Sequence, residues 1–209
     1  MFFLGIGDGR IGEVGVSRRA LLTRAGIRTA PCVFAVLGVT AAPAFADASI
    51  SDLANVRIVC VAKRISINWL TSWVNTPKAV DSKDTADLIR AVRSQEQNHY
   101  SLLAPLLNGT APVDDDYTYS FPPGALRSFD RASTFALDLE EMLLGIAIGA
   151  AATTDDRGVA QTLAQIVASD GQHFSALSVL TGASAVPDSA PRAISIEDGG
   201  NQLSQFLSN

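Results

Sequence analysis

The chain has 209 residues, of which 47% are hydrophobic and 18% charged, and its formal net charge is −5 at pH 7. This length is sufficient for one domain with a hydrophobic core, and the composition excludes a disordered chain. The charge is uneven: residues 1–46 carry five Arg against Asp8 and Glu13, a net of +3, whereas residues 47–209 carry 11 Lys and Arg against 19 Asp and Glu, a net of −8. An acidic domain lacks the basic face that nucleic acids require, so we expect no nucleic-acid partner.

Residues 1–46 have the features of an export signal. The stretch Ser-Arg-Arg-Ala-Leu-Leu-Thr, which contains Arg18 and Arg19, resembles the twin-arginine translocation motif. An apolar run at 30–42 follows, and Ala-Phe-Ala at 44–46 predicts cleavage after Ala46. The run is shorter than the roughly 20 residues that span a bilayer. We therefore predict a removed signal, no stable membrane anchor, and a mature protein in the periplasm, cell envelope or extracellular space.

Apolar residues spaced three and four apart predict a bundle of four helices within residues 47–183. The expected helices span about 51–74, 84–107, 125–152 and 155–180, with Ser51 or Asp52 capping the first and Asp84 the second. The connection at 108–124 is long, as a crossover along a bundle must be. Residues 184–209 form a Pro- and Ser-rich tail that we expect to pack on the bundle, with a short helix near 201–207. Cys60 is expected to be a buried thiol.

Two short motifs place a carboxylate and an imidazole three residues apart: Glu96 with His99, and Asp170 with His173. Residues i and i+3 lie on one face of a helix, so each pair can point at one ion. Both motifs lie within apolar stripes that should face the core and that include Val92 and Leu103 around the first motif and Leu163 and Ile166 around the second. Burying polar groups without partners costs several kcal/mol, of order 2–7 each, and a metal ion is one candidate compensation.

Two further polar residues fall in the predicted core. Glu140 and Asp170 lie at equal distances from the turn at Asp155, so an antiparallel hairpin brings Glu140 opposite the second motif. The same mirror relation in the first hairpin brings Lys63 opposite Glu96. Lys63 is the one charged residue in the apolar stripe of the first helix.

These residues resemble the ferritin-like family of exported bacterial proteins, as do the crossover sequence Tyr-Thr-Tyr-Ser-Phe-Pro-Pro-Gly and the stretch Leu-Glu-Glu-Met-Leu-Leu-Gly that follows. The resemblance implies an all-α, up-down-down-up four-helix bundle with a long crossover between helices 2 and 3, and a di-iron carboxylate site. The chain departs from that pattern at three positions: Lys63 replaces the helix-one Glu, Asp170 replaces a Glu, and Ala147 replaces a Tyr. The implied metal ligands are reduced to Glu96, His99, Glu140, Asp170 and His173.

Two interpretations of a shared site follow, and the third alternative is that these residues are dispersed over the surface. In the first, the five groups bind Fe, Mn or Zn as one ion or an asymmetric pair, and an enzyme built this way would be a metal-dependent oxidase. In the second, no metal is bound, Lys63 forms a network with the carboxylates and histidines, and the protein has a structural or interaction role. The missing helix-one Glu argues against efficient di-iron oxidation. The sequence identifies no catalytic residue and no protein partner, and it is compatible with a homo-oligomer.

Overall fold

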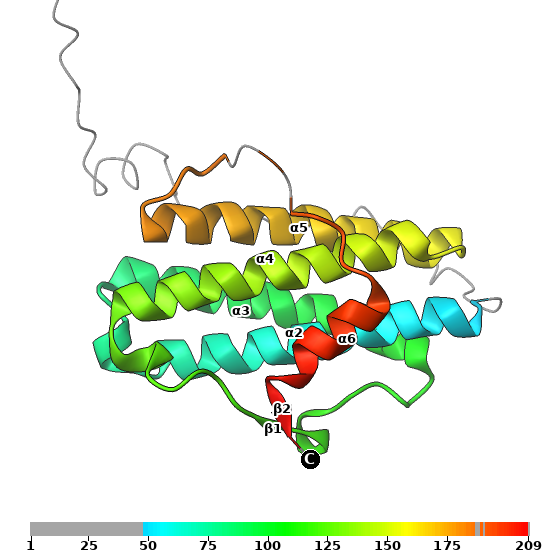
Figure 1. Cartoon of the computed structure of the whole chain (residues 1–209), viewed down its shortest axis with the longest axis horizontal. Coiled ribbons are helices and arrows are strands. Elements are labelled where there is room, and N and C mark those ends of the chain that lie inside the picture. The colour runs from blue at the N-terminus through cyan, green and yellow to red at the C-terminus, as the bar shows by residue number, and fades with distance from the viewer. Residues whose placement is uncertain (1–47, 187–188, 190, 209) are drawn as a thin grey trace, which may run out of the picture. The chain divides into compact units, whose positions relative to one another are not determined.

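The computed structural model describes residues 48–186, 189 and 191–208. Its four long helices are α2 (Ile50–Val74), α3 (Lys83–Leu103), α4 (Phe129–Thr153) and α5 (Arg157–Thr181), which lie side by side in Figure 1. The predicted export signal and its cleavage site lie outside the described residues. Within the described part of the chain, no helix has both the length and the apolar character needed to cross a membrane.

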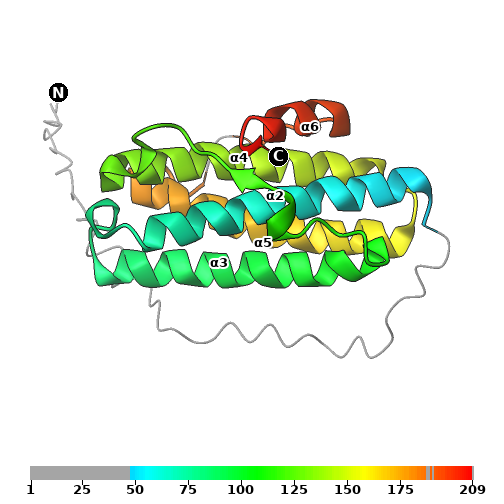
Figure 2. The same ribbon diagram turned by 90° about the horizontal axis from the view of Figure 1, so that it is seen from below.

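The order of the helices is up-down-down-up, which confirms the predicted fold class. α2 packs against α3 and α4 against α5, each pair joined by a short turn (Figure 2). The start of α2 meets the end of α4, because Asn55 Nδ2 donates to the hydroxyls of Thr153 and Thr154 at 3.2 and 2.9 Å. α2 and α4 are therefore antiparallel, and α3 and α4 run in the same direction.

Each long helix begins at a side-chain cap that accepts a backbone N–H two or three residues into the helix. The caps are Ser49, Ser82, Ser128 and Asp156. The expectation that Asp52 or Ser51 caps α2 was wrong, because Asp52 Oδ2 accepts the backbone N–H of Ser49 and Asp52 Oδ1 that of Asp155, at 3.0 and 2.8 Å. Asp52 thus joins the start of α2 to the α4–α5 turn. The expectation of Asp84 as the cap of α3 was also wrong, because Ser82 takes that position.

The crossover from α3 to α4 runs along the bundle (Figure 1). It begins with the 3₁₀ turn η2 (Ala104–Leu107) and passes through η3 (Asp114–Asp116), the short strand β1 (Thr118–Tyr119) and η4 (Ala125–Arg127). Arg64 of α2 holds the crossover in place, because its guanidinium donates to Asp114 Oδ2 at 3.0 Å. The same guanidinium lies over the ring of Tyr100 in α3, 3.9 Å from the ring centre. The acidic run at 114–116 is therefore an exposed turn anchored to the bundle.

The C-terminal segment crosses α4 and is held at both ends. Ile194 N donates to Gly145 O at 2.9 Å, and a Cβ at Gly149 would come within 1.9 Å of Ile194 O. α6 (Ile196–Ser204) then contacts α2 and α4, and β2 (Leu207–Ser208) pairs antiparallel with β1. The helix begins earlier than the predicted 201–207 because Ser195 caps it, and Leu207 lies in the strand.

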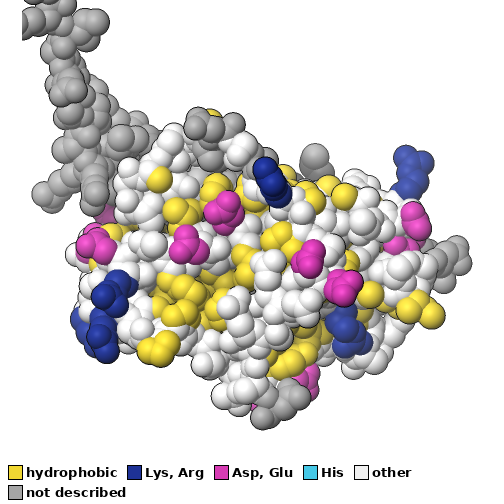
Figure 3. Space-filling view, in the orientation of Figure 1, with side chains coloured by type: hydrophobic (Ala, Val, Ile, Leu, Met, Phe, Trp, Pro, Cys, Tyr) yellow, Lys and Arg dark blue, Asp and Glu magenta, His cyan; other side chains and the backbone are white. Residues whose placement is uncertain are grey.

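The core contains the apolar positions of the predicted stripes, among them Val92 and Leu103 of α3 and Leu163 and Ile166 of α5. Charged side chains lie on the surface drawn in Figure 3, and no histidine is visible on that face. Six charged or titratable side chains nevertheless lie near the middle of the four helices, at the positions where the two motifs enter the core.

Candidate metal centre

All four long helices contribute to a buried polar cluster. α2 provides Lys63, α3 provides Glu96 and His99, α4 provides Glu140, and α5 provides Asp170 and His173. Their exposed fractions run from 0% to 8%. The structure therefore brings together the five candidate ligands and Lys63. Helical periodicity explains the arrangement, since each motif pair is separated by three residues and so faces one side of its helix.

The Lys63 ammonium lies between two carboxylates. Its Nζ is 2.5 Å from Asp170 Oδ2, to which it donates a hydrogen bond, and 2.9 Å from Glu96 Oε2. Burial opposes the charge on Lys63, but attraction to Asp170, Glu96 and Glu140 outweighs it and raises the pKa of the lysine. Lys63 is therefore an internal cation at neutral pH. The same ammonium, acting against burial, holds the pKa of Glu96 well below its usual value.

The two histidines face the carboxylates through Nδ1. His99 Nδ1 is 3.2 Å from Asp170 Oδ1, while His173 Nδ1 is 3.3 Å from Glu96 Oε1, 3.5 Å from Glu140 Oε1 and 3.7 Å from Asp170 Oδ1. The two rings are stacked with their centres 5.9 Å apart. His173 is thus the histidine that approaches all three carboxylates.

Four donor atoms, one each from Glu96, Glu140, Asp170 and His173, lie within 4.8 Å of one another. The described residues provide no hydrogen-bond partner for Glu96 Oε1, Glu140 Oε1, Asp170 Oδ1 or His173 Nδ1, all of which are buried. Donors about 2.1 Å from a tetrahedral ion are about 3.4 Å from one another. The separations of 3.3 to 3.7 Å around His173 Nδ1 match that spacing. This cluster could hold a metal ion.

The charges of the cluster are not balanced by Lys63 alone. Three carboxylates against one ammonium leave a formal charge of −2. Burial and the neighbouring charges of Glu96 and Asp170 raise the pKa of Glu140. Burial lowers the pKa of His173, but attraction to the nearby carboxylates of Glu140 and Glu96 prevails and raises it to about 10. Both shifts favour the protonated forms of these residues when no ion is present.

Sequence reasoning missed Gln95. Its side chain lies behind His173, with Gln95 Oε1 2.5 Å from His173 Nε2. Gln95 is next to Glu96 in the sequence but outside the apolar stripe, so periodicity gave no signal for it. Cys60, by contrast, takes no part in the four-donor cluster; burial raises the pKa of its thiol to about 12, as expected of an unreactive buried cysteine.

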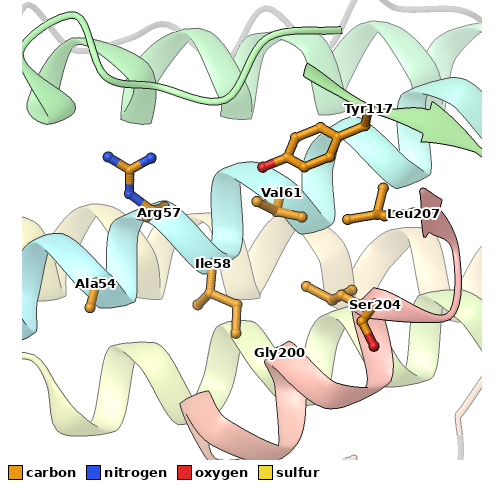
Figure 4. Close-up of a pocket in the computed structure, with 9 residues that line it drawn as sticks. Ala54, Arg57, Ile58, Val61, Tyr117, Gly200, Ser204 and Leu207 are labelled. Carbon is orange, nitrogen blue, oxygen red and sulfur yellow. The ribbon is translucent and has the colours of Figure 1, made fainter. Parts of the chain in front are cut away.

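A surface groove of about 500 Å³ lies elsewhere, between α2, α6 and the end of the β1–β2 ladder (Figure 4). Its walls are largely apolar, and Arg57 is the one charged residue that lines it. None of the six residues of the buried cluster lines this groove.

Comparisons with known proteins agree with this architecture. A family model described as a ferritin-like domain matches residues 37–183. Neither the curated proteins nor the solved structures yield a match to the chain.

Proposed function

Since the family match spans more than half of its length, the chain belongs to the ferritin-like domain family, and we propose that it binds one divalent transition-metal ion in the bundle core, beside Lys63. Glu96, Glu140, Asp170 and His173 would hold the ion. The observation that carries this proposal is the convergence of four buried donor atoms for which the described residues provide no hydrogen bond. Leaving such atoms unpaired costs about 1–3 kcal/mol each, and coordination of an ion removes that cost.

The residues do not fit the two-ion site that the resemblance implies. Lys63 occupies the helix-one position where that site has a carboxylate, and its Nζ already contacts Asp170 and Glu96 at 2.5 and 2.9 Å. A second cation there would lie against the ammonium and lack a ligand. One divalent ion also balances the formal charge of −2, which supports a single-ion site.

Carboxylate and imidazole donors suit Fe, Mn or Zn. Bound Fe or Mn would supply redox chemistry, and bound Zn would supply structural support or Lewis acidity. With Lys63 in place of a ligand, we propose that the protein is not a two-iron oxidase.

The features of residues 1–46 support export by the twin-arginine pathway, and replacing Arg18 and Arg19 together with lysine should abolish that export.

A second candidate function has its own supporting observation. Lys63 contacts Asp170 and Glu96, and the raised pKa of His173 favours a second cation in the cluster, so in this network much of the carboxylate charge can be compensated without an ion. A protein with this network would be a structural or interaction module that retains the bundle without metal.

Metal content separates the two candidates. Protein exported from cells grown with added iron or manganese should contain about one ion per chain, and the metal-free protein should bind Co²⁺ saturably with the visible absorption of a low-symmetry site. Glu140→Gln should weaken Co²⁺ binding at least about tenfold. Its neighbour Glu141 is exposed, so Glu141→Gln is the matched control and should bind as the wild type does. Absence of both native metal and saturable Co²⁺ binding would leave the metal-free network as the better account.

Lys63→Glu tests the number of ions. This change restores the helix-one carboxylate and makes the formal charge of the cluster −4, so the variant should bind two divalent ions per chain. A variant that still binds one ion would show that Lys63 does not stand in the position of a second ion.

A further inference from the structure

Gln95 holds one side of the His173 ring while the carboxylates face the other. On the outer side, His173 Nε2 and Gln95 Oε1 are 2.5 Å apart. On the inner side, His173 Nδ1 lies 3.3 Å from Glu96 Oε1 and 3.5 Å from Glu140 Oε1. Because Gln95 directly precedes Glu96 on α3, the same turn of helix supplies a core carboxylate and a contact to the outer nitrogen of the histidine.

The chemistry of the Gln95 contact decides which nitrogen carries a proton. An amide oxygen only accepts, so the Nε2 that faces it must be the N–H of the ring. When the ring gives up its second proton to bind a metal, Nδ1 is therefore the nitrogen with the free lone pair. His173 Nδ1 lies 3.3 to 3.7 Å from one oxygen of each of the three carboxylates in the four-donor set. His99 is not a member of the four-donor set.

We propose that Gln95 is a positioning residue that fixes the His173 Nε2–H and so makes His173 Nδ1 the ligand of the metal ion. This inference rests on the proposed single-ion site. Histidines that bind metals generally donate their second N–H to an acceptor that sets the tautomer and the ring orientation. An amide performs this role without adding a charge to a cluster that already has three carboxylates.

The test uses three variants of the full protein and the histidine side-chain nitrogens as reporters. Gln95→Leu removes the acceptor, Gln95→Glu retains an acceptor, and Gln97→Leu changes an exposed glutamine on the same helix as a control. With two histidines in the chain, ¹⁵N-histidine spectra are assigned by comparison with His99→Gln. The wild type should show a His173 Nε2–H protected from solvent exchange in the metal-free protein, and ligation through Nδ1 after addition of Zn²⁺.

Gln95→Leu should lose the protected Nε2–H signal and bind Zn²⁺ about 10–100-fold more weakly. Gln95→Glu should keep the signal and the affinity, which separates the acceptor role from a role in packing. Gln97→Leu should match the wild type in both measurements.

The outcomes distinguish this inference from the proposed function. Zn²⁺ bound through His173 Nε2 in the wild type, or an unchanged spectrum and affinity in Gln95→Leu, would overturn the role of Gln95 while leaving the metal site in place. A protected Nε2–H that disappears in Gln95→Leu, in a protein that binds no Zn²⁺, would support the positioning contact and overturn the metal site.

Discussion

Replacing Lys63 with methionine is the most direct perturbation of the buried cluster. The change keeps most of the apolar stem but removes the ammonium, so Asp170 and Glu96 lose a cation that stands 2.5 and 2.9 Å away. Removing one member of a buried ion pair costs about 3–5 kcal/mol, because it leaves an uncompensated charge in a medium of low polarity. For a protein of this size each kcal/mol corresponds to roughly 2–4 °C, so Tm should fall by about 6–20 °C.

The matched control is Lys83→Met. Lys83 pairs with Asp87 on the surface, where its side chain is 85% exposed. Exposed pairs contribute about 0–1 kcal/mol, so this variant should unfold within about 1 kcal/mol of the wild type. The same chemical replacement therefore has very different expected costs at the two lysines, and the difference comes from burial.

The assay is urea unfolding of chelator-treated protein, followed by circular dichroism and repeated with excess Mn²⁺ or Zn²⁺. Divalent metal should restore part of the stability of Lys63→Met, because an added cation would compensate the carboxylate charge that the ammonium no longer compensates. A Lys63→Met protein as stable as Lys83→Met without metal would refute the reasoning, since it would mean that the ammonium does not compensate buried charge.

Further predictions concern pH and backbone packing. The pKa of His173 is raised from 6.5 to about 10, so its stabilisation of the metal-free fold is complete below pH 6.5 and is lost as the pH rises toward 10. Unfolding free energies should fall by several kcal/mol, on the order of 3–5, over that interval. His173→Leu should show a much smaller slope, because His99, whose pKa is also raised, still titrates. Metal binding at the proposed site would displace the proton of His173, so the Zn²⁺ affinity measured by calorimetry should rise about 10-fold per pH unit between pH 6 and 8; a flat profile would contradict the assignment of His173 as a ligand. A Cβ at Gly171 meets nothing within 4 Å, so Gly171→Ala should stabilise α5 by about 0.5–1 kcal/mol in thermal unfolding. Gly149→Ala would place a methyl group 1.9 Å from Ile194 O and should destabilise the protein by about 1–3 kcal/mol in the same measurement.

The fold was predictable because the helix stripes agree with the connection lengths. The positions of Val92, Leu103, Leu163 and Ile166 in the seams are the ones found in the core, and the long crossover required two parallel helices. Helix starts were harder to predict, because several Ser and Asp residues compete for each cap. Asp52 shows the reason: its carboxylate accepts a backbone N–H from a turn 103 residues away, and no local pattern contains that partner.

The candidate site was predictable to the extent that polar residues interrupt apolar stripes. Lys63, Glu96 and Glu140 stand out because a charge in a seam requires compensation, and mirror symmetry about a turn locates its partner. Gln95 could not be found this way, because a glutamine beside a seam is usual on a helix surface. Its contact with His173 depends on how α3 and α5 are rotated, and side-chain packing determines that rotation.

The charge of the cluster relates the metal-bound and metal-free interpretations to each other. Three carboxylates and Lys63 leave a formal −2, which is costly in a core of low polarity, so a divalent ion or bound protons would stabilise the cluster. The pKa values of His173, Glu140 and His99 are all raised, which favours their protonated forms. His173 and Glu140 belong to the four-donor set and His99 does not, so an ion would compete with protons at the first two residues. We infer that the protonated network and the proposed metal site are alternative states of the same residues: the network would stabilise the ion-free bundle, and the residues would release protons on binding an ion.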